Sequence, residues 1–168
     1  TQYEYDELFR LTKIIEPAVT GQSIETAMEY DEVGNLIKLT DARGFSTTYE
    51  FDLRDRLTKI IDPVNGDPHP TQMFYDSVDN LTKFIDPAGR VTEYKYDALD
   101  RLTEIIDPVN TLIGESTVME YDLAGNLRFI TDALGNITEH EFDRAGRLIE
   151  TTLEDPDGAA SLDSPVTT

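Results

Sequence analysis

One phrase recurs seven times along this chain: an aromatic residue followed by aspartate, with a leucine five residues after the aspartate. Seven copies cannot all be active sites. A regular period of 20 to 50 residues is typical of a stacked array, in which each unit buries its apolar face only against its neighbours. The pairs are Tyr5 and Asp6, Tyr30 and Asp31, Phe51 and Asp52, Tyr75 and Asp76, Tyr96 and Asp97, Tyr121 and Asp122, and Phe142 and Asp143.

Two kinds of unit alternate. Successive aspartates of the pairs lie 21, 24 or 25 residues apart, so the true period is a pair of units, 45 or 46 residues long. The Arg-type units carry an arginine before the leucine: Arg10, Arg56, Arg101 and Arg147. The Asn-type units carry an asparagine there: Asn35, Asn80 and Asn126. We therefore expect residues 1–168 to form a single array of seven units and to be a fragment of a longer repeat protein.

The segments on either side of each pair read as β-strands. In "TTYEFD" the side chains of Thr47, Tyr49 and Phe51 fall on one face and those of Thr48 and Glu50 on the other, which is the alternation of a half-buried strand. A second run rich in branched and aromatic residues follows each leucine, as in "LTKIID". Strand, turn and strand predict one hairpin per unit and an all-β chain.

The aspartate of each pair opens a tight turn. An Asp carboxylate accepts hydrogen bonds from backbone N–H groups that follow it, and a glycine at the end of the turn adopts positive φ without a clash. Asp31 and Gly34 show the pattern, and Phe9 departs from it. Aspartate, which tolerates the left-handed region, replaces the glycine at Asp55, Asp79 and Asp100. Short turns of the same kind are expected to close the Asn-type units at residues 41–44, 86–89 and 132–135.

One slot, two residues before the aromatic, is predicted to point inward. It holds Tyr3, Tyr49, Tyr94 and His140 in the Arg-type units and Met28, Met73 and Met119 in the Asn-type units. Rows of such side chains stabilise neighbouring hairpins by about 0.2–1 kcal/mol per pair, so we interpret them as core ladders. Leu57 and Ile60 lie three apart, which requires either a β-bulge or two partly covered faces.

The charge of the chain limits its partners. With 34 acidic and 14 basic residues the net charge is −20, which opposes binding to nucleic acid or to anionic membranes. The chain contains no cysteine, and no apolar run approaches the length needed to span a bilayer. Because it starts inside a repeat, any export signal is expected to lie outside these residues.

The combination of Tyr-x-(Tyr/Phe)-Asp, Gly-Arg-Leu or Gly-Asn-Leu, and Asp-Pro-x-Gly resembles the RHS/YD-repeat family. The match runs from residue 1 to about residue 156, and residues 121–150 are its closest copy. The resemblance implies a continuous antiparallel sheet of stacked hairpins that curves or spirals into a shell. Such shells enclose a toxic segment in bacterial Rhs and Tc-type toxins and form part of an adhesion receptor in teneurins.

Candidate chemical sites are few. The carboxylates lie in repeating turn positions, so we expect neither general acid–base catalysis nor a resident cofactor. His69 and His140 fall in a loop and in a ladder slot, which opposes a metal site. Calcium is the one ion for which oxygen ligands cluster in loops, and the candidate ligands are Asp155, Asp157 and Asp67.

These observations favour a non-catalytic structural segment of a large secreted or cell-surface protein, serving as the wall of a shell or as a fibre. Its partners would be flanking repeats of the same polypeptide or identical subunits, with no nucleic acid and no membrane insertion. The alternative is an extracellular adhesion module that binds a carbohydrate or a protein through its tyrosine rows and long loops. A calcium-loaded surface layer is a third hypothesis, and an enzyme is the last.

Overall fold

The computed structural model describes residues 1–17, 24–62, 70–107 and 116–154. His69 and the calcium candidates Asp67, Asp155 and Asp157 lie outside these ranges. The described residues form fourteen β-strands and no helix, as the alternation predicts. The strands are β1 (Gln2–Tyr5), β2 (Leu11–Glu16), β3 (Ile24–Tyr30), β4 (Leu36–Thr40), β5 (Ser46–Phe51), β6 (Leu57–Ile61), β7 (Thr71–Tyr75), β8 (Leu81–Ile85), β9 (Val91–Tyr96), β10 (Leu102–Ile106), β11 (Ser116–Tyr121), β12 (Leu127–Thr131), β13 (Ile137–Phe142) and β14 (Leu148–Glu154).

The strands follow one another through a single open sheet in chain order, from β1 to β14. Neighbouring strands whose register is defined pair antiparallel, so the sheet is a meander of hairpins. This confirms the all-β hairpin array. The chain divides into two compact units: unit 1 comprises Thr1–Phe74 and Phe84–Arg90, and unit 2 comprises Tyr75–Lys83 and Val91–Thr168.

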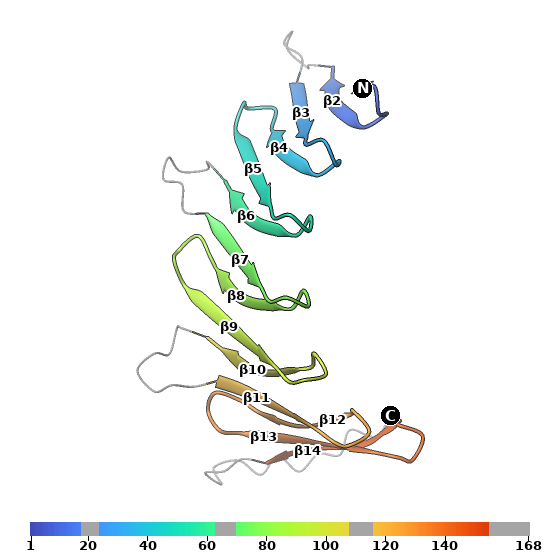
Figure 1. Cartoon of the computed structure of the whole chain (residues 1–168), viewed down its shortest axis with the longest axis vertical. Helices are drawn as coiled ribbons and strands as arrows, with labels where there is room; N and C mark the ends of the chain where they lie inside the picture. The colour runs from blue at the N-terminus through green and yellow to red at the C-terminus, as the bar shows by residue number, and fades with distance from the viewer. Residues whose placement is uncertain (18–23, 63–69, 108–115, 155–168) are drawn as a thin grey trace. The chain divides into compact units, whose positions relative to one another are not determined.

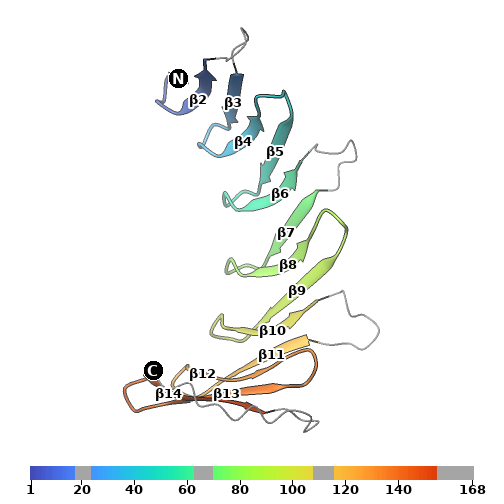
Figure 2. The same cartoon turned by 180° about the vertical axis from the view of Figure 1, so that it is seen from behind.

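The turns of the aromatic-aspartate pairs gather on one side within each unit. In unit 1 the turns after β1, β3 and β5 lie at the same end of the strands, and the short turn between β4 and β5 lies at the opposite end (Figures 1 and 2). In unit 2 the turns after β9, β11 and β13 also lie together at one end of the strands. Each unit therefore carries its repeated turns as a row.

The two faces of the sheet differ in chemistry because side chains alternate along a strand. On one face, which we call the apolar face, Met28 lies opposite Leu39 and Tyr49 lies opposite Ile60. The other, which we call the charged face, places Glu29 opposite Lys38. Cross-strand pairs of both kinds stabilise a sheet by about 0.2–1 kcal/mol each. The inward ladder slot thus belongs to the apolar face.

A β-bulge follows the turn in each of the six pair hairpins whose register is defined. In the third hairpin Glu50 pairs with Lys59 and Phe51 pairs with Leu57, which leaves Thr58 as the extra residue. The Thr58 hydroxyl donates to the carbonyl of Glu50 at 3.1 Å. The bulge explains how Leu57 and Ile60, three apart in sequence, both reach the apolar face.

Neither face is closed over by the described part of the chain. None of its side chains, apolar or polar, is fully buried. Strand-to-strand hydrogen bonds and contacts between neighbouring hairpins therefore hold these residues together, as in other repeat arrays. No helix in the described ranges has the length and apolar character needed to cross a membrane.

The fourth residue of each turn adopts the left-handed conformation. Glycine fills this position with φ of 104° at Gly34, 91° at Gly125 and 75° at Gly146. Three aspartates and one aromatic residue adopt it as well, and Phe9 has φ of 60° with 89% of its surface exposed. A bulky residue in this region is strained, and the exposed ring of Phe9 gains little packing in return.

We predict that Phe9→Gly stabilises the chain by about 0.5–1 kcal/mol, because the strain that it relieves exceeds the extra entropy that glycine gives to the unfolded chain. The matched control is Gly34→Ala. No atom lies within 4 Å of the Cβ that it would add, but φ at Gly34 is 104°, so a loss of about 1 kcal/mol is expected. Urea unfolding followed by circular dichroism measures both changes, and a destabilised Phe9→Gly chain would contradict the strain argument.

Candidate functional site

The Asp31 turn shows how one carboxylate organises a hairpin end. Its Oδ1 accepts backbone N–H groups of Val33 at 3.1 Å, Gly34 at 2.8 Å and Asn35 at 2.8 Å. Its Oδ2 accepts the side-chain amide of Asn35 at 3.0 Å. The backbone closes the same loop, because Asp31 N donates to the carbonyl of Asn35 at 3.0 Å. One side chain therefore satisfies most of the donors in the turn.

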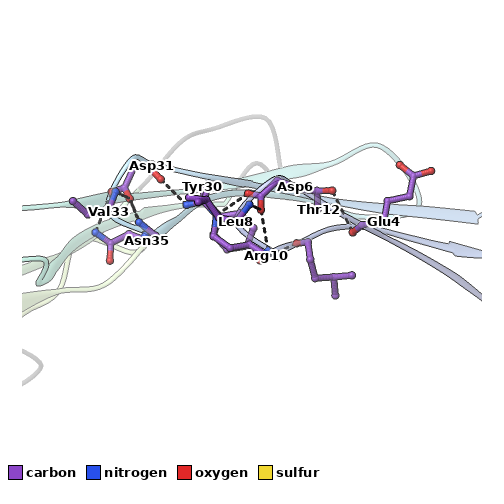
Figure 3. A network of polar contacts seen from close by, with 11 residues as sticks. Glu4, Asp6, Leu8, Arg10, Thr12, Tyr30, Asp31, Val33 and Asn35 are labelled. Carbon is purple, nitrogen blue, oxygen red and sulfur yellow. Dashed lines mark hydrogen bonds and ion pairs between the residues drawn. The ribbon is translucent and has the colours of Figure 1, made fainter.

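The Arg-type turn keeps this arrangement with a different partner. Asp6 Oδ1 accepts the N–H groups of Leu8 and Arg10, each at 2.9 Å, and Asp6 Oδ2 accepts Nε of Arg10 at 2.7 Å (Figure 3). Aspartates in the other pairs bond in the same way to the second and fourth residues after them. The sequence reasoning anticipated the acceptor role but not the side chain that completes it.

Arginine also joins one hairpin to the next. In unit 1, Nη1 of Arg10 donates to the carbonyl of Asp31 at 2.8 Å, and its guanidinium lies 4.9 Å from the centre of the Tyr30 ring (Figure 3). The Tyr30 hydroxyl donates to the carbonyl of Leu11 at 2.9 Å. Tyr30 is thus held by a cation–π contact and a hydrogen bond, both supplied by the preceding hairpin.

Unit 2 contains the same junction. The Arg101 guanidinium lies 4.4 Å from the centre of the Tyr121 ring, and the Tyr121 hydroxyl donates to the carbonyl of Leu102 at 2.8 Å. Tyr96 likewise donates to the carbonyl of Leu81 at 3.0 Å. A tyrosine hydroxyl in the pair therefore bonds to the leucine carbonyl of the hairpin before it. This contact explains why the pair so often carries tyrosine rather than phenylalanine.

Asparagine makes a different link. The side-chain amide of Asn35 donates to Asp55 Oδ1 at 3.1 Å, and that of Asn80 donates to Asp100 Oδ1 at 3.1 Å. The aspartates that replace glycine in these two turns therefore accept a hydrogen bond from the preceding hairpin. The third turn that follows an Asn-type hairpin has a glycine at this position, Gly146. There the side-chain oxygen of Asn126 lies 3.7 Å from the point that a Cβ on residue 146 would occupy. The sequence carries no signal that singles out this link, since Gly146 also follows an Asn-type unit and Asp79 follows an Arg-type unit.

The charged face carries a second set of links. Within hairpins, Glu29 pairs with Lys38 at 2.8 Å and Glu104 pairs with Lys95 at 2.7 Å. Between consecutive hairpins, Arg128 pairs with Glu139 at 3.1 Å. At least one partner of each pair is more than half exposed, so each pair contributes little stability. They do balance part of the acidic charge locally.

The turn aspartates are held ionised. The guanidinium of Arg56 donates to Asp52 and, together with backbone N–H groups of Arg54 and Arg56, outweighs desolvation and lowers the pKa of Asp52 below its ordinary value. At Asp31 desolvation raises the pKa, but the amide groups of Asn35, Gly34 and Val33 together outweigh it and leave the pKa of Asp31 lowered. Hydrogen bonds to the charged form produce such shifts. The cause is turn geometry rather than a catalytic pocket.

This arrangement offers little for chemistry. A carboxylate already occupied by three or four donors of its own turn is poorly placed to take a proton from a substrate. In the described ranges no three His, Cys, Asp or Glu side chains come together in a group that could hold a metal ion. The buried Nδ1 of His140 has no hydrogen-bond partner, and a single ring nitrogen does not make a metal centre.

Comparison with known proteins identifies the fold. The RHS Repeat family model matches residues 30–66, 75–111 and 114–160. No curated protein matches the chain. A TcdB2-TccC3-Cdc42 crystal structure superposes with a TM-score of 0.64 at 20% identity, covering 79% of this chain and 7% of that one. A TcdB2-TccC3 crystal structure gives 0.51 at 17% identity, covering 95% and 11%.

A third solved structure, a Photorhabdus luminescens Tc holotoxin pore, superposes with a TM-score of 0.51 at 16% identity, covering 80% of this chain and 9% of that one. The chain therefore spans about a tenth of the length of each of these three structures. At such identities the likeness concerns the fold alone.

We predict that the turn aspartates make the chain lose stability in acid. A group with a lowered folded pKa contributes stability that is complete above the ordinary Asp value of about 3.9 and is lost as the pH falls through the folded pKa. Asp31→Asn keeps an acceptor oxygen but cannot ionise. The gap in unfolding free energy between the wild type and Asp31→Asn should therefore shrink below about pH 4.

The control for the acid experiment is Glu32→Gln, which removes a carboxylate of the same turn for which the described structure shows no hydrogen bond. Its gap from the wild type should stay nearly constant over the same range. Denaturant unfolding at several pH values measures both gaps. A gap for Asp31→Asn that does not change with pH would contradict the role given to the Asp31 charge.

We further predict that Tyr30→Phe and Tyr121→Phe each cost about 1 kcal/mol of unfolding free energy, because each leaves a leucine carbonyl without its hydroxyl donor. Tyr3→Phe is the matched control, since Tyr3 is 57% exposed and its hydroxyl has no hydrogen bond in the described structure. Urea titration resolves the difference. Equal effects of all three changes would show that the hydroxyl contact between hairpins is not specific.

Proposed function

The chain belongs to the RHS-repeat family, and we propose that it is a non-catalytic wall segment of a much larger shell-forming protein. RHS-repeat folds of this kind are generally structural. One observation carries the proposal: the residues that recur in every hairpin make contacts to their own turn and to the neighbouring hairpin. The turn aspartates, which recur in every hairpin, are engaged in building the array.

The open sheet supports a role within a larger assembly. None of its described residues is fully buried, and among the described strands β1 and β14 each have a single neighbour. A sheet edge offers unpaired N–H and C=O groups to another strand. We therefore propose that flanking repeats of the same polypeptide or identical subunits complete both edges, and that residues 1–168 are one array of seven hairpins within a longer protein.

The proposed setting is a secreted or surface-exposed protein. One of the solved structures that share the fold is a Tc holotoxin pore, and a toxin-shell role for this chain rests on that analogy. Residues 1–168 contain no cysteine, so we propose that this segment of such a shell is held by hydrogen bonds and packing.

Adhesion is the second candidate, favoured by the partly exposed tyrosines of the apolar face, among them Tyr3 at 57% and Tyr5 at 59%. The long loops assigned to this role fall mostly in residues 18–23, 63–69 and 108–115, outside the described ranges. A glycan array and a screen of extracellular proteins test it directly. Saturable binding that Tyr3→Ala removes would favour adhesion over a purely structural wall.

The wall role is tested by deleting whole repeats. Removing residues 76–121 joins Tyr75 to Asp122 and takes out one complete two-hairpin period, so an Arg-type hairpin is still followed by an Asn-type hairpin. We predict that the shortened chain folds into a five-hairpin array. Its denaturant m-value should fall roughly in proportion to its length, and its circular dichroism spectrum should remain that of β-sheet.

The matched control removes residues 76–96 and joins Tyr75 to Asp97. This chain is longer, but it places two Arg-type hairpins in succession and loses the Asn80 link to Asp100. It should therefore be less stable per residue than the two-hairpin deletion. If the two-hairpin deletion unfolded while the one-hairpin deletion folded, the periodic wall would be refuted.

A further inference from the structure

A second pattern runs through the turns that follow the aromatic-aspartate pairs. Each of the first six turns places one leucine or valine at the first or second position after its aspartate. Turn geometry does not call for these residues, because turns favour Gly, Pro, Asn, Asp and Ser. All six are exposed: Leu8, Val33, Leu53, Val78, Leu99 and Leu123. The hairpins therefore carry aliphatic side chains that their own fold does not use.

The three aliphatic residues of unit 2 belong to internal hairpins. Val78, Leu99 and Leu123 lie in the turns after β7, β9 and β11, at one end of the strands (Figure 1). Val78 is 57% exposed, Leu99 is 71% exposed and Leu123 is fully exposed. We call these three residues the turn row of unit 2, and Leu8, Val33 and Leu53 the turn row of unit 1. Single exposed leucines are ordinary, but a row that recurs with every hairpin indicates a contact surface.

Contacts between consecutive turns hold the row of unit 2 in order. The side-chain amide of Asn80 donates to Asp100 Oδ1 at 3.1 Å, which ties the first turn of the row to the second. The Arg101 guanidinium lies 4.4 Å from the centre of the Tyr121 ring, which ties the second turn to the third. Neighbouring strands lie about 4.8 Å apart, so the turns of consecutive hairpins are spaced by about 9.6 Å.

The backbone of these turns favours a helical partner over an extended one. In each turn the opening aspartate accepts the N–H groups of the second and fourth residues after it. An extended segment would find few groups with which to form a ladder, whereas an α-helix satisfies its own backbone. One helical side chain in every seven recurs after about 10.5 Å. The row therefore fits a helix that presents one apolar side chain per heptad to each turn.

The surroundings of the row are acidic. The three turns of unit 2, residues 76–80, 97–101 and 122–126, contain five aspartates and one arginine. That arginine, Arg101, already donates to Asp97 Oδ2 at 2.7 Å. The chain as a whole carries a net charge of −20. A basic partner is attracted to such a surface, while a second copy of the chain or an anionic membrane is repelled.

We propose that the turn row of each unit docks an amphipathic helix of another protein. The apolar stripe of that helix covers the leucine and valine side chains, and its lysine or arginine residues flank the stripe beside the turn carboxylates. The docking site goes beyond the wall role, because a wall needs no contact at the turn ends of its hairpins. It also uses no residue of β1 or β14, so it is independent of what completes the sheet edges.

The test uses a fluorescent 21-residue peptide of alanine and lysine with a leucine at every seventh position. A control peptide has the same composition, but its three leucines lie on different faces of the helix. Fluorescence anisotropy with the full chain should show that the striped peptide binds about ten-fold more tightly than the control peptide. Equal affinities of the wild type for the two peptides would overturn the proposal, since charge alone would then account for binding.

A protein variant tests the row itself by replacing all six of its residues with alanine. Alanine already occupies these turn positions at Ala98, Ala124 and Ala145, so circular dichroism should show an unchanged fold. The preference for the striped peptide should disappear. The control Leu134→Ala removes an exposed leucine from the short turn between β12 and β13 and should keep the preference. A preference that survives in the row variant would contradict the docking site.

Two further measurements distinguish other occupants of the row. Sedimentation equilibrium should show no dimer of the wild type that the row variant abolishes. Flotation with phosphatidylcholine vesicles should show no binding that depends on the row. A row-dependent dimer would assign the surface to a second copy of the chain, and row-dependent vesicle binding would assign it to a lipid surface. Either result would overturn the helix as its partner.

Discussion

The carboxylate at the start of each turn is the interaction on which the rest of this structure depends. It accepts the N–H groups of its own turn with one oxygen and the side chain of the fourth residue with the other, as Asp6 does with Arg10 and Asp31 with Asn35. Because that fourth residue is held in place, its remaining donors point at the next hairpin. A local turn motif is thereby converted into a contact between repeats.

This conversion matters because the described chain has no conventional core. No described side chain is fully buried. The burial of apolar surface, which stabilises a globular domain, is therefore limited to the partial covering of one face. Contacts between neighbouring hairpins carry a correspondingly larger share of the stability, as the nearest-neighbour view of repeat proteins requires. The alternation of arginine and asparagine gives each hairpin a distinct neighbour to recognise.

The architecture could be predicted from the sequence because it depends on local signals that repeat. The same hairpin is predicted by three signals: the alternation around Tyr49, the turn from Asp31 to Gly34 and the spacing of the pairs. Because the signals repeat, a repeat that departs from the pattern can still be interpreted from the others. The links between hairpins were harder to predict. Asp55 was interpreted as a tolerated replacement for glycine, whereas its carboxylate also accepts the Asn35 amide. Single-residue propensities cannot reveal that contact, since it joins residues 20 apart whose meeting depends on the register of two strands.

The same reasoning explains why the sequence has a period of two hairpins rather than one. In unit 1 an Arg-type turn needs a ring to lie against and a carbonyl to reach, and Tyr30 and Asp31 supply them. An Asn-type turn reaches only far enough to bond a carboxylate in the next turn, and Asp55 supplies it. If every hairpin were Arg-type, each turn would add a cation. If every hairpin were Asn-type, the aromatic rings would lose their cation–π partners. Alternation keeps both kinds of contact and leaves the chain strongly acidic. The specific contacts favour pairing of hairpins in register, while repulsion between acidic chains opposes nonspecific association through open sheet edges.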